Sequence, residues 1–190
     1  IMDTLEPLLP KSLFPSQRES IRNAIEQKNN WYQLIMKIMT DINPEVRDDL
    51  LKTFVIDANL LAWTQQEKSR KKYECNIPWA ILLDPTSACN LHCTGCWAAD
   101  YGNALNLSYD DIDSIITQGK ELGVHIYIYT GGEPLVRKKD LIALCEKHSD
   151  AAFLSFTNAT LIDEEFCKEC VRVGNLSFSL SLEGFEEAND

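Results

Sequence analysis

The chain has 190 residues, of which 45% are hydrophobic and 25% charged, an ordinary composition for a globular protein. Its 29 acidic and 18 basic residues give a net charge of -11. This charge argues against a nucleic-acid partner, which would require a basic face. No run approaches the ~20 apolar residues of a membrane-spanning helix, and the start of the chain lacks the features of a secretory signal. The sequence therefore predicts a cytoplasmic protein with no membrane partner.

Both ends of the chain suggest that it is part of a longer protein. Ile1 precedes Met2, so the first residue is not an ordinary start. The last residues directly follow a strand-like run, and no further helix comes after it. We therefore expect the sequence to be truncated.

The first part of the chain, residues 1–75, reads as an α-helical extension. Ser16 and Glu19 have the spacing of a capping box, and Asn43-Pro44 reads as an N-cap followed by proline at the first helical position. One apolar face is expected on the helix that follows, formed by Val46, Leu50, Leu51, Phe54, Ala58 and Leu61.

The second part, residues 76–190, has an α/β pattern. Helices are expected to begin at Ser108, Asp140 and Asp163, and glycines end the first and third of them. They alternate with four short apolar runs at 79–84, 125–130, 152–157 and 176–182. A β-α-β-α-β-α-β order requires a parallel sheet with right-handed crossovers. In such folds the chemistry lies at the carboxyl ends of the strands.

A cysteine triad follows the first predicted strand, with Cys89, Cys93 and Cys96 at C-x3-C-x2-C spacing. Thiolates are the usual ligands of iron–sulfur clusters, and three of them leave one iron of a cubane open. A zinc site that adds His92 or Cys75 is the alternative, because zinc favours four nitrogen or sulfur ligands. Three further cysteines are expected to be buried as small hydrophobic residues in the helices: Cys145, Cys167 and Cys170.

The triad and three later motifs together resemble the radical S-adenosylmethionine (SAM) superfamily. These motifs are Thr130-Gly131-Gly132-Glu133-Pro134 after the second strand, Thr157-Asn158-Ala159 after the third, and 179–184 at the fourth. The resemblance covers residues 79–184. It implies a partial parallel (βα) barrel, of which this chain holds the first four strands and three helices. The sequence departs from the family pattern at Gly95, where the family has an aromatic residue, at Ala159 and at Glu183.

The resemblance also implies an activity and its cofactors. A [4Fe–4S] cluster on Cys89, Cys93 and Cys96 would reduce SAM and release a 5′-deoxyadenosyl radical, which abstracts hydrogen from a substrate. The backbone of Gly131 and Gly132 would approach the methionine end of SAM, and Glu133 would accept from its ammonium group. Asn158 and Ser181 would meet its ribose or carboxylate. No residue is predicted to act as a catalytic acid, base or nucleophile.

The partners follow from the same resemblance. The substrate is expected to be a small molecule or a peptide, as in the branch of the superfamily with additional C-terminal, SPASM-type domains. A low-potential donor such as flavodoxin or ferredoxin would reduce the cluster, docking on Arg137, Lys138 and Lys139. The alternative function is a non-catalytic module that binds an iron–sulfur cluster or zinc.

Overall fold

The computed structural model describes residues 15–182 and 184–185, so residues 1–14 of the predicted extension and Glu183 lie outside the described part. Contacts divide the chain into two compact units, Ile1–Arg47 and Asp48–Asp190. This boundary differs from the one predicted after residue 75, because the helical residues from 48 onwards contact the sheet more than the preceding helices.

The first unit holds α2 (Pro15–Gln27), α3 (Asn30–Asp41) and the start of α4 (Pro44–Leu50). Asn29 caps α3, and Asn43 accepts from the Glu45 amide at 2.8 Å, as expected for an N-cap before Pro44. The capping box predicted at Ser16 does not form. Because α2 begins at Pro15, Ser16 already lies inside the helix, where its hydroxyl donates to Gln17.

The second unit continues from α4 through a π-helical segment, η2 (Leu51–Leu61), into α5 (Ala62–Tyr73). The apolar face predicted from α-helical spacing is wrong at two positions, since Phe54 is 40% and Leu61 64% exposed. Backbone bonds to the residue five positions back widen the turn and change which side chains share a face. Thr53 and Ala58, five residues apart, are the buried positions of η2.

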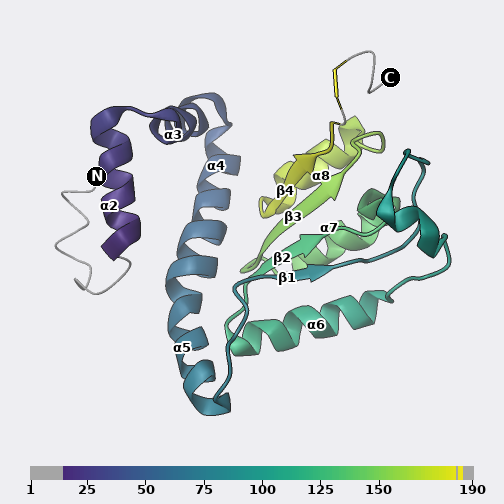
Figure 1. Ribbon diagram of the computed structural model, residues 1–190, viewed down its shortest axis with the longest axis horizontal. Helices are drawn as coiled ribbons and strands as arrows, with labels where there is room; N and C mark the ends of the chain where they lie inside the picture. The colour runs from purple at the N-terminus through teal and green to yellow at the C-terminus, as the bar shows by residue number, and fades with distance from the viewer. Residues whose placement is uncertain (1–14, 183, 186–190) are drawn as a thin grey trace. The chain divides into compact units, whose positions relative to one another are not determined.

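Four strands form one sheet in the order β1 (Ile81–Leu83), β2 (Ile126–Tyr129), β3 (Ala152–Thr157) and β4 (Leu176–Leu180). All three neighbouring pairs are parallel (Figure 1). This confirms the predicted parallel sheet, in which the strands are neighbours in chain order, as a partial (βα) barrel requires. The carboxyl ends of the strands therefore lie along one edge, and every predicted site residue belongs to a segment that leaves this edge.

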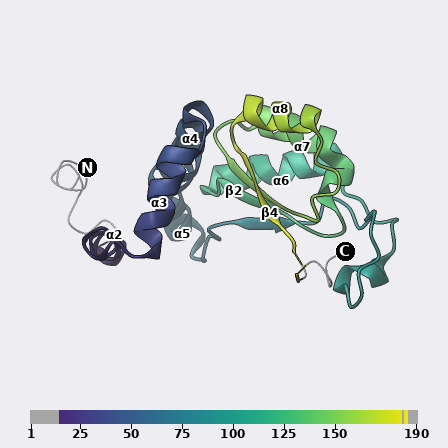
Figure 2. The same ribbon diagram turned by 90° about the horizontal axis from the view of Figure 1, so that it is seen from above.

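Three helices connect the strands: α6 (Tyr109–Leu122), α7 (Lys138–Lys147) and α8 (Glu164–Val173). They lie on one face of the sheet (Figure 2). Ser108 forms a reciprocal capping box with Asp111, and Asp163 accepts from the Phe166 amide, as predicted. Asp140 does not begin α7, because the short 3-10 helix η4 (Pro134–Arg137) precedes that helix and moves its start to Lys138.

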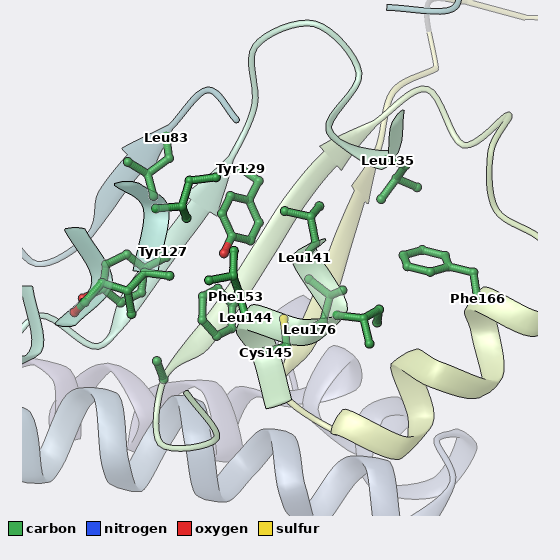
Figure 3. Close-up of a cluster of buried hydrophobic side chains, with 14 residues drawn as sticks. Leu83, Tyr127, Tyr129, Leu135, Leu141, Leu144, Cys145, Phe153, Phe166 and Leu176 are labelled. Carbon is green, nitrogen blue, oxygen red and sulfur yellow. The ribbon is translucent and has the colours of Figure 1, made fainter. Parts of the chain in front are cut away.

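The main core fills the space between the sheet and these helices (Figure 3). Phe153 stacks on Tyr127 and Tyr129, with ring centroids 5.8 and 5.6 Å apart. The opposite face of the sheet is covered at its amino-terminal end, where Ala58 of η2 contacts Ile126 and Ala152. No helix in the described part of the chain is long and apolar enough to cross a membrane.

Candidate functional site

The three cysteines of the triad lie on the loop that leaves the carboxyl end of β1. Cys89 is partly exposed, and Cys93 and Cys96 are exposed. A tight turn joins the last two, with the Cys96 amide donating to the Cys93 carbonyl at 3.2 Å and Gly95 at a φ of +75°. Across the described residues, no three Cys, His, Asp or Glu side chains converge as a ready-made metal site. The three thiols thus lie on one loop, but their sulfur atoms do not converge on a single point.

The chemistry of this loop fits an iron–sulfur cluster. The Leu91 amide donates to the Cys89 sulfur at 3.4 Å, the type of bond that stabilises thiolate ligands and tunes a cluster. A zinc site completed by Cys75 does not suit the topology. Cys75 precedes the amino end of β1, whereas the triad follows its carboxyl end.

The remaining cysteines differ in their burial. Cys145 is fully buried and Cys170 packs against the core, as predicted. The prediction for Cys167 is wrong, because it is exposed. On α8, Phe166 and Cys170 are four residues apart and share the inner face, so the residue after Phe166 turns towards solvent.

The glycine pair after β2 packs directly on the base of the cysteine loop. The Gly132 amide donates to the Thr86 carbonyl at 3.0 Å. A Cβ on Gly132 would lie 2.3 Å from the Ala88 carbonyl oxygen, and Gly131 has a φ of +103° that only glycine adopts readily. The two glycines are therefore required by this close backbone approach.

The Glu133 carboxylate is 1% exposed and joins three segments of the chain. Its Oε1 accepts from the Leu135 amide at 3.0 Å and from the Thr157 hydroxyl at 2.8 Å, and its Oε2 accepts from the Asn158 amide at 2.8 Å. Its own amide donates to the Ala88 carbonyl at 2.8 Å. Glu133 thus connects the ends of β2 and β3 with the cysteine loop. The sequence placed Thr157 in a motif but did not predict its bond to Glu133, because partners on different strands leave no signal in the spacing.

Asn158 is held in a second network at the same edge. Its Nδ2 donates to Oδ1 of Asn90, the residue after Cys89, at 3.0 Å, and Asn90 in turn donates to the Thr160 hydroxyl at 2.7 Å. Ala159 has a φ of +66°, so the glycine that the family carries at this position would relieve backbone strain. Asn158 therefore ties the cysteine loop to the end of β3.

Ser181 follows β4 at the same edge of the sheet. Its amide donates to the Thr157 carbonyl at 2.9 Å, and the residue is exposed. The structure thus brings Gly132, Glu133 and Asn158 into one hydrogen-bonded assembly with the cysteine loop, with Gly131 packed against Thr86 and Ser181 beside it.

Two of the three cations predicted to dock an electron donor have internal partners. Arg137 pairs with Asp140 at 2.6 Å and donates to the Pro85 and Leu107 carbonyls. Lys138 pairs with Asp163. These contacts tie the segments around the site together, so the tripeptide is not a free basic patch.

A cavity of about 470 Å³ opens beside the glycine pair. It reaches from the start of the cysteine loop to Trp97, the residue after Cys96, which packs edge-on against Tyr101 with centroids 5.9 Å apart. The lining residues are Asp84, Thr86, Ser87, Trp97, Ala98, Tyr101, Ala104, Leu105, Asn106, Leu107, Gly131 and Gly132.

Comparison with known proteins decides the family. A profile of the radical SAM superfamily matches residues 83–189, more than half of the chain. The chain belongs to the radical SAM superfamily. The [4Fe–4S] cluster and SAM that were predicted from the motifs are the cofactors of this superfamily.

Individual relatives agree with this assignment. The chain is 33% identical to the Fe-coproporphyrin III synthase of Methanosarcina barkeri over 114 residues, 58% of this chain and 28% of that protein. It is 32% identical to the PqqA peptide cyclase of Bradyrhizobium diazoefficiens over 126 residues, 64% of this chain and 33% of that protein. The radical SAM chain thus spans about a third of the curated relatives that it matches.

A solved structure supports the fold. Streptococcus suis SuiB bound to its precursor peptide SuiA superposes with a TM-score of 0.55 and 25% identity. The match covers 66% of this chain and 29% of SuiB. The four parallel strands with their helices therefore correspond to part of a radical SAM α/β barrel, as predicted.

Proposed function

We propose that the protein is a radical SAM enzyme in which Cys89, Cys93 and Cys96 hold the [4Fe–4S] cluster. When bound at these residues, the cluster and SAM would supply radical chemistry, the abstraction of a hydrogen atom from a substrate. The observation that carries the proposal is the fastening of the cysteine loop to the ends of β2 and β3, through the Gly132 and Glu133 amides and Asn158.

The chain's own residues would position the cofactors. The three thiolates hold the cluster, and the Leu91 amide stabilises the negative charge on the Cys89 sulfur. The backbone of Gly131 and Gly132 lines the adjacent cavity, where SAM would lie. Glu133, Asn158 and Ser181 complete the edge on which SAM would rest.

For the substrate, we propose a peptide or a small molecule. A peptide is favoured by the similarity to SuiB, whose structure contains a precursor peptide, and to the PqqA peptide cyclase. Small-molecule chemistry is favoured by the similarity to an Fe-coproporphyrin III synthase. A flavodoxin or ferredoxin remains the proposed electron donor.

The alternative function, a non-catalytic iron–sulfur or zinc module, has less support. A purely structural site has no need for a cavity beside the glycine pair, and the similar proteins are named as synthases and cyclases.

Anaerobic reconstitution tests the proposal. The protein should take up about four iron atoms per chain, and alanine in place of Cys89, Cys93 or Cys96 should abolish the stable cluster. Cys167→Ala is the matched control, since this exposed thiol on α8 lies outside the loop and its loss should leave iron content unchanged. Iron, sulfide and zinc analyses provide the readout, together with 5′-deoxyadenosine release after reduction. Stoichiometric zinc without iron uptake would refute the proposal.

A further inference from the structure

A ring of three polar side chains fastens the cysteine loop to the end of β3. Asn90, the residue after the first cysteine, accepts from Nδ2 of Asn158 at 3.0 Å and donates to the Thr160 hydroxyl at 2.7 Å. The Thr160 hydroxyl in turn donates to Oδ1 of Asn158 at 2.7 Å. Each side chain therefore donates one hydrogen bond and accepts another, so the three bonds support one another.

The part of this ring that belongs to the β3 end is anchored in the protein interior. The Asn158 amide donates to the buried Glu133 carboxylate at 2.8 Å, and the Thr160 amide donates to Oδ1 of Asn158 at 3.0 Å. The Ala159 amide between them donates to a buried threonine hydroxyl of β3 at 3.0 Å. All three successive amides of the turn have fixed partners, so Asn90 is held against an ordered segment of backbone.

The cysteine loop has no other polar support of this kind. Its base is held at Ala88, whose carbonyl accepts from the Glu133 amide. Among the residues that the structure describes, the two bonds of Asn90 are the only hydrogen bonds that join residues 89–96 to another segment. Residues 90–96 are exposed. The side chain of Asn90 is therefore the hydrogen-bonded link between this stretch and the sheet.

The peptide unit that follows Asn90 acts on one of the expected cluster ligands. Its N–H is that of Leu91, which donates to the Cys89 sulfur at 3.4 Å. An N–H dipole that points at a ligand sulfur stabilises added negative charge, so it favours the reduced form of a cluster and raises its reduction potential. Because the peptide unit between Asn90 and Leu91 is planar, fixing Asn90 also limits the rotation of this donor.

We propose that Asn90 is a positioning residue, which raises the reduction potential of the cluster by holding the Leu91 amide on the Cys89 sulfur. This inference rests on the proposed function. Asn90 acts only through the Leu91 amide and through the ring that it forms with Asn158 and Thr160. When the ring is broken, the Leu91 amide is free to turn towards water, and the cluster becomes harder to reduce.

Redox titration of the reconstituted protein tests this inference without SAM and without turnover. The signal of the reduced cluster in electron paramagnetic resonance is followed against the solution potential. In Asn90→Ala the equilibrium constant for reduction should fall about tenfold, which is about 59 mV for a one-electron couple. Thr160→Val removes one hydroxyl of the ring from outside the cysteine loop and should lower the potential as well. Neither substitution changes the charge of the protein.

Two further variants show whether the effect comes from the ring. Thr160→Ser keeps the hydroxyl and should keep the wild-type potential. Thr117→Val makes the same chemical change as Thr160→Val at an exposed position of α6, and it should also keep the wild-type potential. Iron and sulfide contents are measured for each variant, so that potentials are compared for the intact [4Fe–4S] form.

The outcomes separate this inference from the function on which it rests. Wild-type protein that takes up no cluster contradicts the proposed function itself. An unchanged or higher potential in cluster-loaded Asn90→Ala or Thr160→Val overturns the role of Asn90, and so does a shift in Thr160→Ser as large as that in Thr160→Val. Loss of the cluster from both Asn90→Ala and Thr160→Val would assign the ring to cluster assembly, which also overturns the inference.

Discussion

At the scale of single residues, the site depends on buried polar groups whose partners come from other strands. The Thr157 hydroxyl donates to the Glu133 carboxylate, and the Ala159 amide donates to the same hydroxyl oxygen at 3.0 Å. Thr157 is 2% exposed, so water does not replace a lost bond easily. One hydroxyl therefore stabilises both a buried charge and the strained turn at Ala159.

This arrangement predicts a large effect of Thr157→Val, which keeps the shape of the side chain and removes the hydroxyl. The free energy of unfolding should fall by about 1.5–3 kcal/mol, the scale of hydrogen bonds to charged groups. Urea unfolding at neutral pH measures it.

Thr53→Val is the matched control for this measurement. Thr53 is also buried, but its hydroxyl donates to the Asp49 carbonyl within the same helical stretch at 2.7 Å, and that oxygen carries no full charge. A loss of about 1 kcal/mol or less is expected here. Equal losses in the two variants would contradict a special role for Thr157.

At the scale of elements, the end of β2 and the cysteine loop are held at backbone contact distance. Gly132 makes this contact, because its missing Cβ leaves room for the Ala88 carbonyl. The position of the cysteine loop is therefore set by another element as well as by its own sequence.

Gly132→Ala should displace the cysteine loop while leaving the sheet and helices intact. We expect cluster content to fall to a small fraction of the wild-type value, with an unchanged far-ultraviolet circular dichroism spectrum. Gly102→Ala is the control, since this glycine has a φ of +64° but open space around its Cβ position. It should cost about 1 kcal/mol of stability and leave iron content unchanged. Normal iron content in Gly132→Ala would show that the contact is not needed for cluster binding.

At the scale of the whole molecule, a buried histidine links the helices and makes stability depend on pH. His148 is 4% exposed, and its Nε2 lies 2.9 Å from Asp113 of α6. Burial lowers the pKa of His148, and nearby Lys120 lowers it further, although Asp113 and Asp150 oppose the shift. The folded protein therefore holds His148 neutral at a pH where the unfolded chain takes up a proton.

The neutral state of His148 determines how the free energy of unfolding changes with pH. Because the unfolded chain binds more protons, the free energy of unfolding should fall as the pH drops below the ordinary histidine pKa of 6.5. Asp113 and Asp150 have lowered pKa values, from hydrogen bonds to Lys147 and Lys120 respectively, so their contribution is lost only below the ordinary value of 3.8. Between about pH 7.5 and about pH 5 the histidine dominates this change.

His148→Gln should therefore reduce the loss of stability between these two pH values. Urea unfolding of the wild type and the variant at each pH measures the difference. An identical slope in wild type and His148→Gln would rule out His148 as the responsible group.

Much of this protein was determined by local sequence signals. Strands and helix ends at Ser108 and Asp163 were predictable because apolar periodicity and capping depend on residues a few positions apart. The parallel sheet followed from the alternation of strands and helices, and the family from the spacing of a few motifs. Each of these features depends on residues that are close together in the sequence, so the sequence alone predicts it.

Only the tertiary structure decided how the elements act on one another. Phe54 and Leu61 are exposed because η2 has π-helical rather than α-helical turns. Asp140 is not the first residue of α7, because the 3-10 helix η4 leads directly into that helix. The internal bonds of Glu133 and the cavity position of Asp84 depend on which strand ends become neighbours. Hydrogen bonding and close packing between distant segments produce no periodic pattern in the sequence. The motifs could therefore be recognised from the sequence, whereas their contacts were visible only in the folded structure.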